Sequence, residues 1–166
     1  MAELIKHAFI SDKTWTKELL ANPTFTNPSL EWLAPELLRG IVDEIRPLAD
    51  LDVDRIVTVE AMGIPLSIAL SLATGIPVTV IRKRKYGLPG ETVVGQETGY
   101  RKGSLYLNGL APGTRVLFVG DVISTGGTLG PLLRAFAEAQ IIVKDIVVVI
   151  EKGEGRAKLE REQGVR

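Results

Sequence analysis

The sequence predicts an α/β fold in which helices cover both faces of a parallel sheet. Segments with strand and helix patterns alternate along the chain, as they do where crossover helices join parallel strands. Most of the predicted strands are continuous apolar runs, which is typical of strands buried on both faces. These strands are expected at residues 55–59, 76–81, 115–119 and 146–150.

The predicted helices show apolar residues at helical spacing and have glycine or proline at their ends. The first begins near Pro35 and stops before Pro47, and a short helix over Leu66–Ala73 ends at Gly75. A third helix is expected at 129–139, and a charged helix closes the chain.

Two segments contain few core-forming residues. Residues 1–29 are irregular, with Asn-Pro pairs that indicate turns. Residues 86–104 are rich in glycine, so we expect a flexible flap there, followed by a short strand at 105–107. The full length of 166 residues, 45% of them hydrophobic, suits a single domain over residues 1–166.

Composition excludes several classes of function. The formal net charge is zero, so no global field draws the protein to nucleic acid or to a membrane surface, and the absence of cysteine excludes thiol nucleophiles and cysteine-ligated zinc. The uncharged stretch Ala61–Ile81 has the hydropathy of a membrane span, but glycines and prolines divide it into a short helix and a strand. We therefore expect a soluble, cytoplasmic protein.

The strongest motif is the segment Val116–Thr128, in which an apolar strand leads into an acid, two hydroxyl residues and paired glycines at the start of a helix. Glycine amides, hydroxyls and a helix N-terminus together favour an anion. Ser124–Thr128 should therefore hold a phosphate, and Asp121 should hold ribose hydroxyls or a metal. A Walker-type loop is excluded because no lysine follows the glycines.

Two more predicted strands end in unusual loops, Glu60–Gly63 and the basic run Arg82–Lys85. The basic run could be a solvated surface feature, but its place at a strand end near the other loops favours phosphate binding. In a parallel sheet the carboxyl ends of the strands share one edge, so all three loops should meet there.

These segments resemble the motifs of type I phosphoribosyltransferases. Val116–Thr128 resembles the family's motif for phosphoribosyl diphosphate (PRPP), and Glu60–Pro65 resembles its diphosphate-binding loop. Ile81–Glu91, Thr98–Gly103 and Glu151–Gly155 are similar to the archaeal hypoxanthine/guanine branch, which in turn resembles adenine phosphoribosyltransferases. The resemblance extends over residues 35–164.

The resemblance implies a fold with a flexible flap at 86–104 and a small N-terminal hood at 1–34. It also implies a binding role for each loop. The 5-phosphate of PRPP would be bound by Ser124, Thr125, Gly126, Gly127 and Thr128, and the ribose by Asp121. The diphosphate would be bound by Ala61, Met62, Gly63, Arg82, Lys83 and Lys85.

The resemblance further implies an enzyme of purine salvage whose catalytic residues are Asp121, Arg82 and Lys85. It implies a Mg²⁺ cofactor held through PRPP, with Asp121 as a possible protein ligand. The expected partners are PRPP, a purine base and a second copy of the chain in a homodimer, with no nucleic acid and no membrane.

The chain departs from the family pattern at two positions. Gly120 stands where the family usually has the first of two adjacent acids, and Ser124 stands where many 6-oxopurine enzymes have an aspartate. Phe25, which could equally be a core anchor, and Val122 are candidates for contact with the base. The archaeal-type motifs favour hypoxanthine or guanine, adenine is the alternative base, and a non-catalytic PRPP sensor is the alternative of another class.

Overall fold

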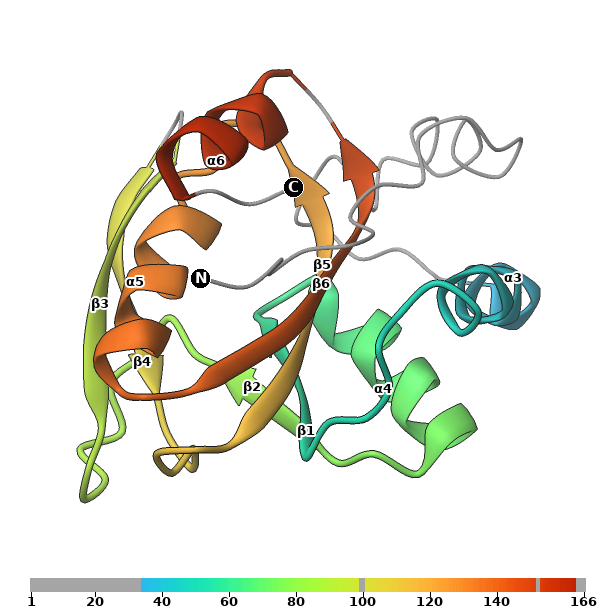
Figure 1. Ribbon diagram of the computed structural model, residues 1–166, viewed down its shortest axis with the longest axis horizontal. Helices are drawn as coiled ribbons and strands as arrows, with labels where there is room; N and C mark the ends of the chain where they lie inside the picture. The colour runs from blue at the N-terminus through green and yellow to red at the C-terminus, as the bar shows by residue number, and fades with distance from the viewer. Residues whose placement is uncertain (1–33, 99–100, 152, 164–166) are drawn as a thin grey trace.

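The computed structural model describes residues 34–98, 101–151 and 153–163. Its centre is a four-stranded parallel sheet with the strand order β2-β1-β5-β6 (Figure 1). The strands are β1 (Arg55–Val59), β2 (Val78–Ile81), β5 (Arg115–Ile123) and β6 (Ile142–Glu151). The prediction of a parallel sheet is confirmed.

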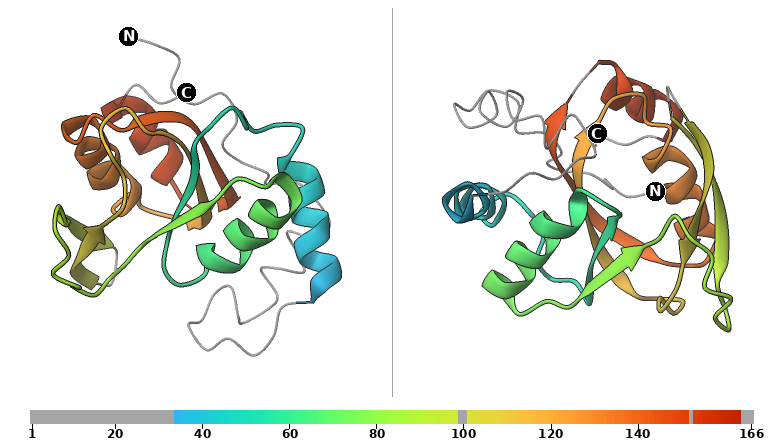
Figure 2. Two further views of the ribbon diagram at one scale, coloured as in Figure 1. Left: turned by 90° about the horizontal axis from the view of Figure 1, so that it is seen from below. Right: turned by 180° about the vertical axis from the view of Figure 1, so that it is seen from behind.

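Helices cover both faces of this sheet. Helices α3 (Pro35–Ile45) and α4 (Gly63–Thr74) lie side by side on one face, and α5 (Leu129–Glu138) lies on the other (Figures 1 and 2). Because side chains alternate along a strand, β5 and β6 each supply residues to the cores on both faces. The α5 core contains Val116, Phe118, Ile146 and Val148, and the α3–α4 core contains Leu117, Val119, Val147 and Val149.

The expectation of a loop before residue 105 was wrong, because this segment forms an antiparallel hairpin of β3 (Thr92–Thr98) and β4 (Arg101–Leu107). The glycines conceal an alternating pattern that buries Val94, Leu105 and Leu107 in the α5 core. A bridge between Arg82 and Tyr106 links the hairpin to the end of β2. The flexibility expected for residues 86–104 stays a prediction.

Several boundaries also differ from the sequence prediction. Strand β5 continues past Val119 to Ile123, because it pairs with β6 as far as Ile123–Glu151, so Asp121 lies within the strand. Helix α4 begins three residues early, at Gly63, and so starts directly after the loop that follows β1.

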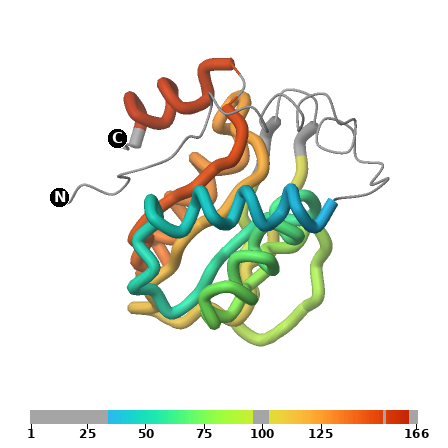
Figure 3. The backbone as a smooth tube through the Cα atoms, turned by 90° about the vertical axis from the view of Figure 1, so that its right-hand side faces the viewer, coloured from blue at the N-terminus to red at the C-terminus, as the bar shows by residue number. Residues whose placement is uncertain are grey.

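Helix α6 (Gly155–Gln163) lies over the carboxyl end of β5, and the smooth backbone trace shows it at the opposite end of the sheet from the β1–α3 connection (Figure 3). The carboxyl edge of the sheet, where the predicted loops meet, therefore lies under α6.

No helix in the described parts of the chain is long and apolar enough to cross a membrane.

The amino edge of the sheet is stabilised by an ion-pair network. Arg115 Nη2 lies 3.0 Å from Asp54 Oδ1, and Nη1 lies 2.9 Å from Asp52 Oδ2. The backbone N–H of Arg115 also donates to Asp54 Oδ2 at 2.8 Å. These hydrogen bonds and the charge of Arg115 lower the pKa of Asp54 below its usual 3.8.

We expect Asp54→Asn to be less stable than the wild type at neutral pH and the difference to shrink as the pH falls below 3.8. A carboxyl whose pKa is lowered by folding stabilises the protein above its unfolded pKa, and this contribution is lost on titration through the folded value. Urea unfolding over a pH series measures it. Asp43→Asn, which removes an exposed carboxylate on α3, is the matched control.

Candidate active site

Three loops follow adjacent strands at the carboxyl edge of the sheet. The strand order places the 82–85 loop after β2, the 60–63 loop after β1 and the 124–128 loop after β5, in that sequence across the edge. The sequence prediction that these loops share one edge is therefore confirmed by the topology.

The 60–63 loop is packed tightly against β5. Thr58 Oγ1 donates a 2.7 Å hydrogen bond to the carbonyl of Val119, and a Cβ at Gly63 would lie 2.0 Å from that hydroxyl oxygen. Only glycine fits there without a rearrangement. The Glu60–Ala61 peptide bond is cis. Since α4 begins at Gly63, its positive N-terminal end faces the same edge.

The 124–128 loop has the conformation expected of an anion-binding turn. Gly126 has a φ of 71°, and the N–H of Gly127 donates to Thr125 Oγ1 at 3.3 Å. Helix α5 begins at Leu129, directly after the loop, and its first turn contains no acidic residue. Loop amides and the helix N-terminus therefore present partial positive charge together.

The C-terminal segment supports this loop from behind, a contact that sequence analysis missed. A Cβ at Gly155 would lie 2.6 Å from the carbonyl oxygen of Ser124 and 2.9 Å from the nitrogen of Gly126. Gly153, with a φ of 79°, approaches the same carbonyl. The glycines of the Glu151–Gly155 motif therefore let backbone pack on backbone.

Asp121 lies near the end of β5 at this edge, and burial raises its pKa above the usual 3.8. Hydrogen bonds from the N–H groups of Val122 and Asp121 and the positive charge of Lys83 act in the opposite direction. At the neighbouring position, a Cβ at Gly120 would lie 3.1 Å from Phe118 Cε1. The position of the missing acid is thus closed by an aromatic ring.

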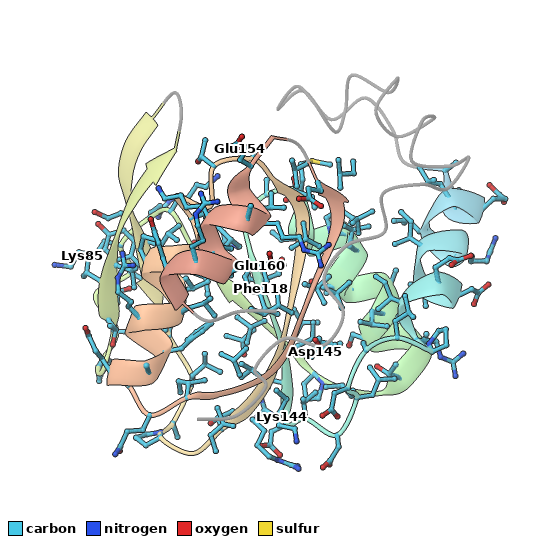
Figure 4. All side chains as sticks on the ribbon, turned by 45° about the horizontal axis from the view of Figure 1, so that its top comes forward. Lys85, Phe118, Lys144, Asp145, Glu154 and Glu160 are labelled. Carbon is cyan, nitrogen blue, oxygen red and sulfur yellow. The ribbon has the colours of Figure 1, made fainter. Side chains whose placement is uncertain are left out.

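The 82–85 loop divides into two parts. Arg82 Nε lies 3.1 Å from Glu60 Oε2, and the N–H of Lys83 donates to Glu60 Oε1. The guanidinium groups of Arg82 and Arg84 both lie near Tyr86, at 5.7 Å and 5.4 Å from its ring centre. Lys85 is exposed, and Figure 4 shows its side chain on the outer side of the hairpin. Arg82 and Lys83 therefore lie nearest the other loops.

Comparison with known proteins agrees with this arrangement. The phosphoribosyl transferase domain family matches residues 25–162. The chain belongs to this phosphoribosyltransferase family. The resemblance inferred from the motifs is thereby confirmed.

Related proteins of this family come from archaea and are named hypoxanthine/guanine phosphoribosyltransferase. The protein of Ferroglobus placidus is 54% identical over 142 residues, which cover 84% of this chain and 76% of its own length. That of Methanocella arvoryzae is 58% identical over 126 residues, which cover 76% of this chain and 66% of its own length. The match therefore spans about two thirds to three quarters of these relatives.

Solved structures with the same fold include several adenine phosphoribosyltransferases. The enzyme of Trypanosoma brucei has a TM-score of 0.71 at 18% identity, with 99% of this chain and 81% of that chain covered. The enzyme of Thermoanaerobacter pseudethanolicus has a TM-score of 0.67 at 24% identity, with 75% and 76% covered. At these identities the likeness shows the fold alone, and it confirms the predicted phosphoribosyltransferase fold.

Of the two candidates for base contact in this phosphoribosyltransferase, the structure describes Val122 but not Phe25. Val122 is partly buried on β5, opposite Ile150 of β6. Phe25 lies outside the described residues, as does the predicted hood. Base contact by either residue stays a prediction.

We expect Gly63→Ala to lower the free energy of unfolding by about 1–3 kcal/mol, as overpacking in a tight interior does. The added methyl collides with Thr58 Oγ1, so the same substitution in a Thr58→Ala background should cost much less. Urea unfolding of the four proteins in this double-mutant cycle measures the coupling. Additive effects would contradict the contact.

Proposed function

We propose that this protein transfers ribose 5-phosphate from PRPP to hypoxanthine or guanine and releases diphosphate. The observation that carries the proposal is the order of the three loops on adjacent strands. PRPP has a phosphate at one end, a diphosphate at the other and a ribose between them. A row of two anion-suited loops and a cationic loop, with the Asp121 carboxylate on β5 between the anion-suited loops, matches that arrangement.

In this proposal the 124–128 loop and the N-terminus of α5 bind the 5-phosphate. Asp121 accepts hydrogen bonds from the ribose hydroxyls. The diphosphate lies against the 60–63 loop and the N-terminus of α4, within reach of Arg82 and Lys83. Lys85 reaches the diphosphate through movement of its exposed side chain.

The chemistry follows from the charges that develop. As the bond between ribose C1 and the diphosphate oxygen breaks, negative charge grows on the leaving group and positive charge on the ribose. Cations and oriented amides that face the leaving group stabilise the first of these charges. The purine nitrogen then forms the new bond to C1 and loses its N–H proton to the released diphosphate or to water.

Mg²⁺ fits these residues as an ion that arrives with the substrate. Within the described ranges no group of three His, Cys, Asp or Glu side chains could hold a metal ion. Phosphate-bound Mg²⁺ usually takes only one or two protein carboxylates and keeps several waters. Asp121 would be its protein ligand here, and the bound ion would offset charge on the diphosphate.

The choice of base rests on the relatives, which carry the name hypoxanthine/guanine phosphoribosyltransferase at 54% and 58% identity. Adenine is the second candidate, because the solved structures that share the fold are adenine enzymes. With Ser124 in the loop, discrimination between the bases would come from backbone groups. A wrong base that leaves such buried groups unpaired costs about 1–3 kcal/mol for each group.

We expect Asp121→Asn to weaken PRPP binding at least about tenfold, because hydrogen bonds to a charged group contribute about 1.5–3 kcal/mol each. Titration calorimetry with PRPP measures the loss, and Asp43→Asn on the exposed face of α3 is the matched control. Since burial raises the pKa of Asp121, wild-type affinity should fall as the pH drops toward that pKa, and the variant should lose this dependence. Equal affinity of variant and wild type would exclude the assigned role.

Initial rates with PRPP, Mg²⁺ and an equimolar mixture of hypoxanthine, guanine and adenine test the base. We expect nucleotide products from the 6-oxopurines to predominate, and Ser124→Ala to keep that preference because the hydroxyl serves loop geometry. Predominance of adenine would assign the second candidate. PRPP binding without any product would indicate the non-catalytic sensor.

A further inference from the structure

Glu60 places a negative charge at the start of a loop that should bind a diphosphate, where a carboxylate by itself would repel the ligand. Its backbone N–H donates to the carbonyl of Ile81 at 3.1 Å, which continues the pairing of β1 with β2. The residue therefore has a fixed position between the two strand ends, and its side chain is 20% exposed.

Both oxygens of the Glu60 carboxylate contact the 82–85 loop. One oxygen accepts the hydrogen bond from the backbone N–H of Lys83, and the other lies 3.1 Å from Arg82 Nε. That Nε is buried and makes no hydrogen bond to the described residues, so Glu60 is the group that compensates its charge there. A buried polar group without a partner is costly, and more so when it is charged.

The remainder of Arg82 is also fixed. Its backbone N–H donates to the carbonyl of Tyr106 at 3.2 Å and its carbonyl accepts from the N–H of Tyr106 at 2.7 Å. Its Nη2 donates to the hydroxyl of Tyr86 at 3.1 Å. Within the described part of the chain no partner occupies Nη1, so one end of the guanidinium is available to a ligand.

We infer that Glu60 is a positioning residue, which holds Arg82 and Lys83 at the 60–63 loop with their cationic groups directed to the diphosphate. This inference rests on the proposed function. The loop contains four cations, Arg82–Lys85, so one carboxylate leaves it strongly positive. Glu60 contacts the Nε edge of the guanidinium and a backbone amide, which leaves Nη1 to the ligand, and this favours positioning over competition with the ligand for the same site.

The test compares two ligands that occupy different loops. Calorimetric titration in Mg²⁺ buffer with pyrophosphate reports on the 60–63 and 82–85 loops, and with ribose 5-phosphate on the 124–128 loop. We expect Glu60→Ala to weaken pyrophosphate binding about tenfold or more and to leave ribose 5-phosphate binding within about twofold. Glu60→Gln should be intermediate, because its amide oxygen keeps the bond from Lys83 but its charge is lost.

Glu36→Ala is the matched control, because it removes an exposed carboxylate that lies 3.4 Å from Arg39 on α3. In steady-state kinetics the Glu60 variants should alter the KM for PRPP and not that for the purine. Unchanged or tighter pyrophosphate binding, or an equal loss for both ligands, would overturn the inference. If Glu60→Ala does not fold, the near-isosteric Glu60→Gln decides by the same criteria. Wild-type protein that binds neither ligand contradicts the proposed function instead.

Discussion

The parallel pairing of β1 with β2 and β5 is the constraint on which the site depends. Parallel strands must all end at the same edge, and here the strands that end in unusual loops are neighbours. The hydrogen bond from Thr58 to the carbonyl of Val119 joins β1, near its carboxyl end, to β5. Spacing between the loops is therefore set by the sheet itself, which lets separate parts of one extended ligand be bound together.

Close backbone packing fixes the loops further. Gly63 lies against the Thr58 hydroxyl, and Gly155 lies against the backbone of Ser124 and Gly126. Neither position has room for a side chain, so the 60–63 loop is held against Thr58 and the 124–128 loop against a segment distant in sequence. Amides fixed in this way need not reorganise when charge develops on a bound ligand, which is the condition for effective electrostatic stabilisation.

Charge is distributed unevenly along the edge. The cations lie on one side, in the 82–85 loop. Glu60 contacts this loop from the neighbouring 60–63 loop and adds one negative charge there. Asp121 lies nearer the other side, where burial raises its pKa and Lys83 partly offsets that effect. Gly120, packed on Phe118, provides no second acid beside Asp121. Such an edge suits a substrate with its greater negative charge at one end.

The sequence by itself determined the parallel α/β class and the three loops that meet at the carboxyl edge, because apolar runs, glycines and charges at strand ends are local signals. It did not disclose the β3–β4 hairpin, since glycines obscured an alternation that only burial against α5 makes favourable. The sequence also predicted that β5 ends before Asp121. Pairing with β6 extends the strand beyond that residue, and this pairing has no local signal in the sequence. Only the tertiary structure decided the contacts of Glu60 with Arg82 and of Gly155 with Ser124. Each contact joins residues that are far apart in the sequence, where no local pattern indicates that they meet.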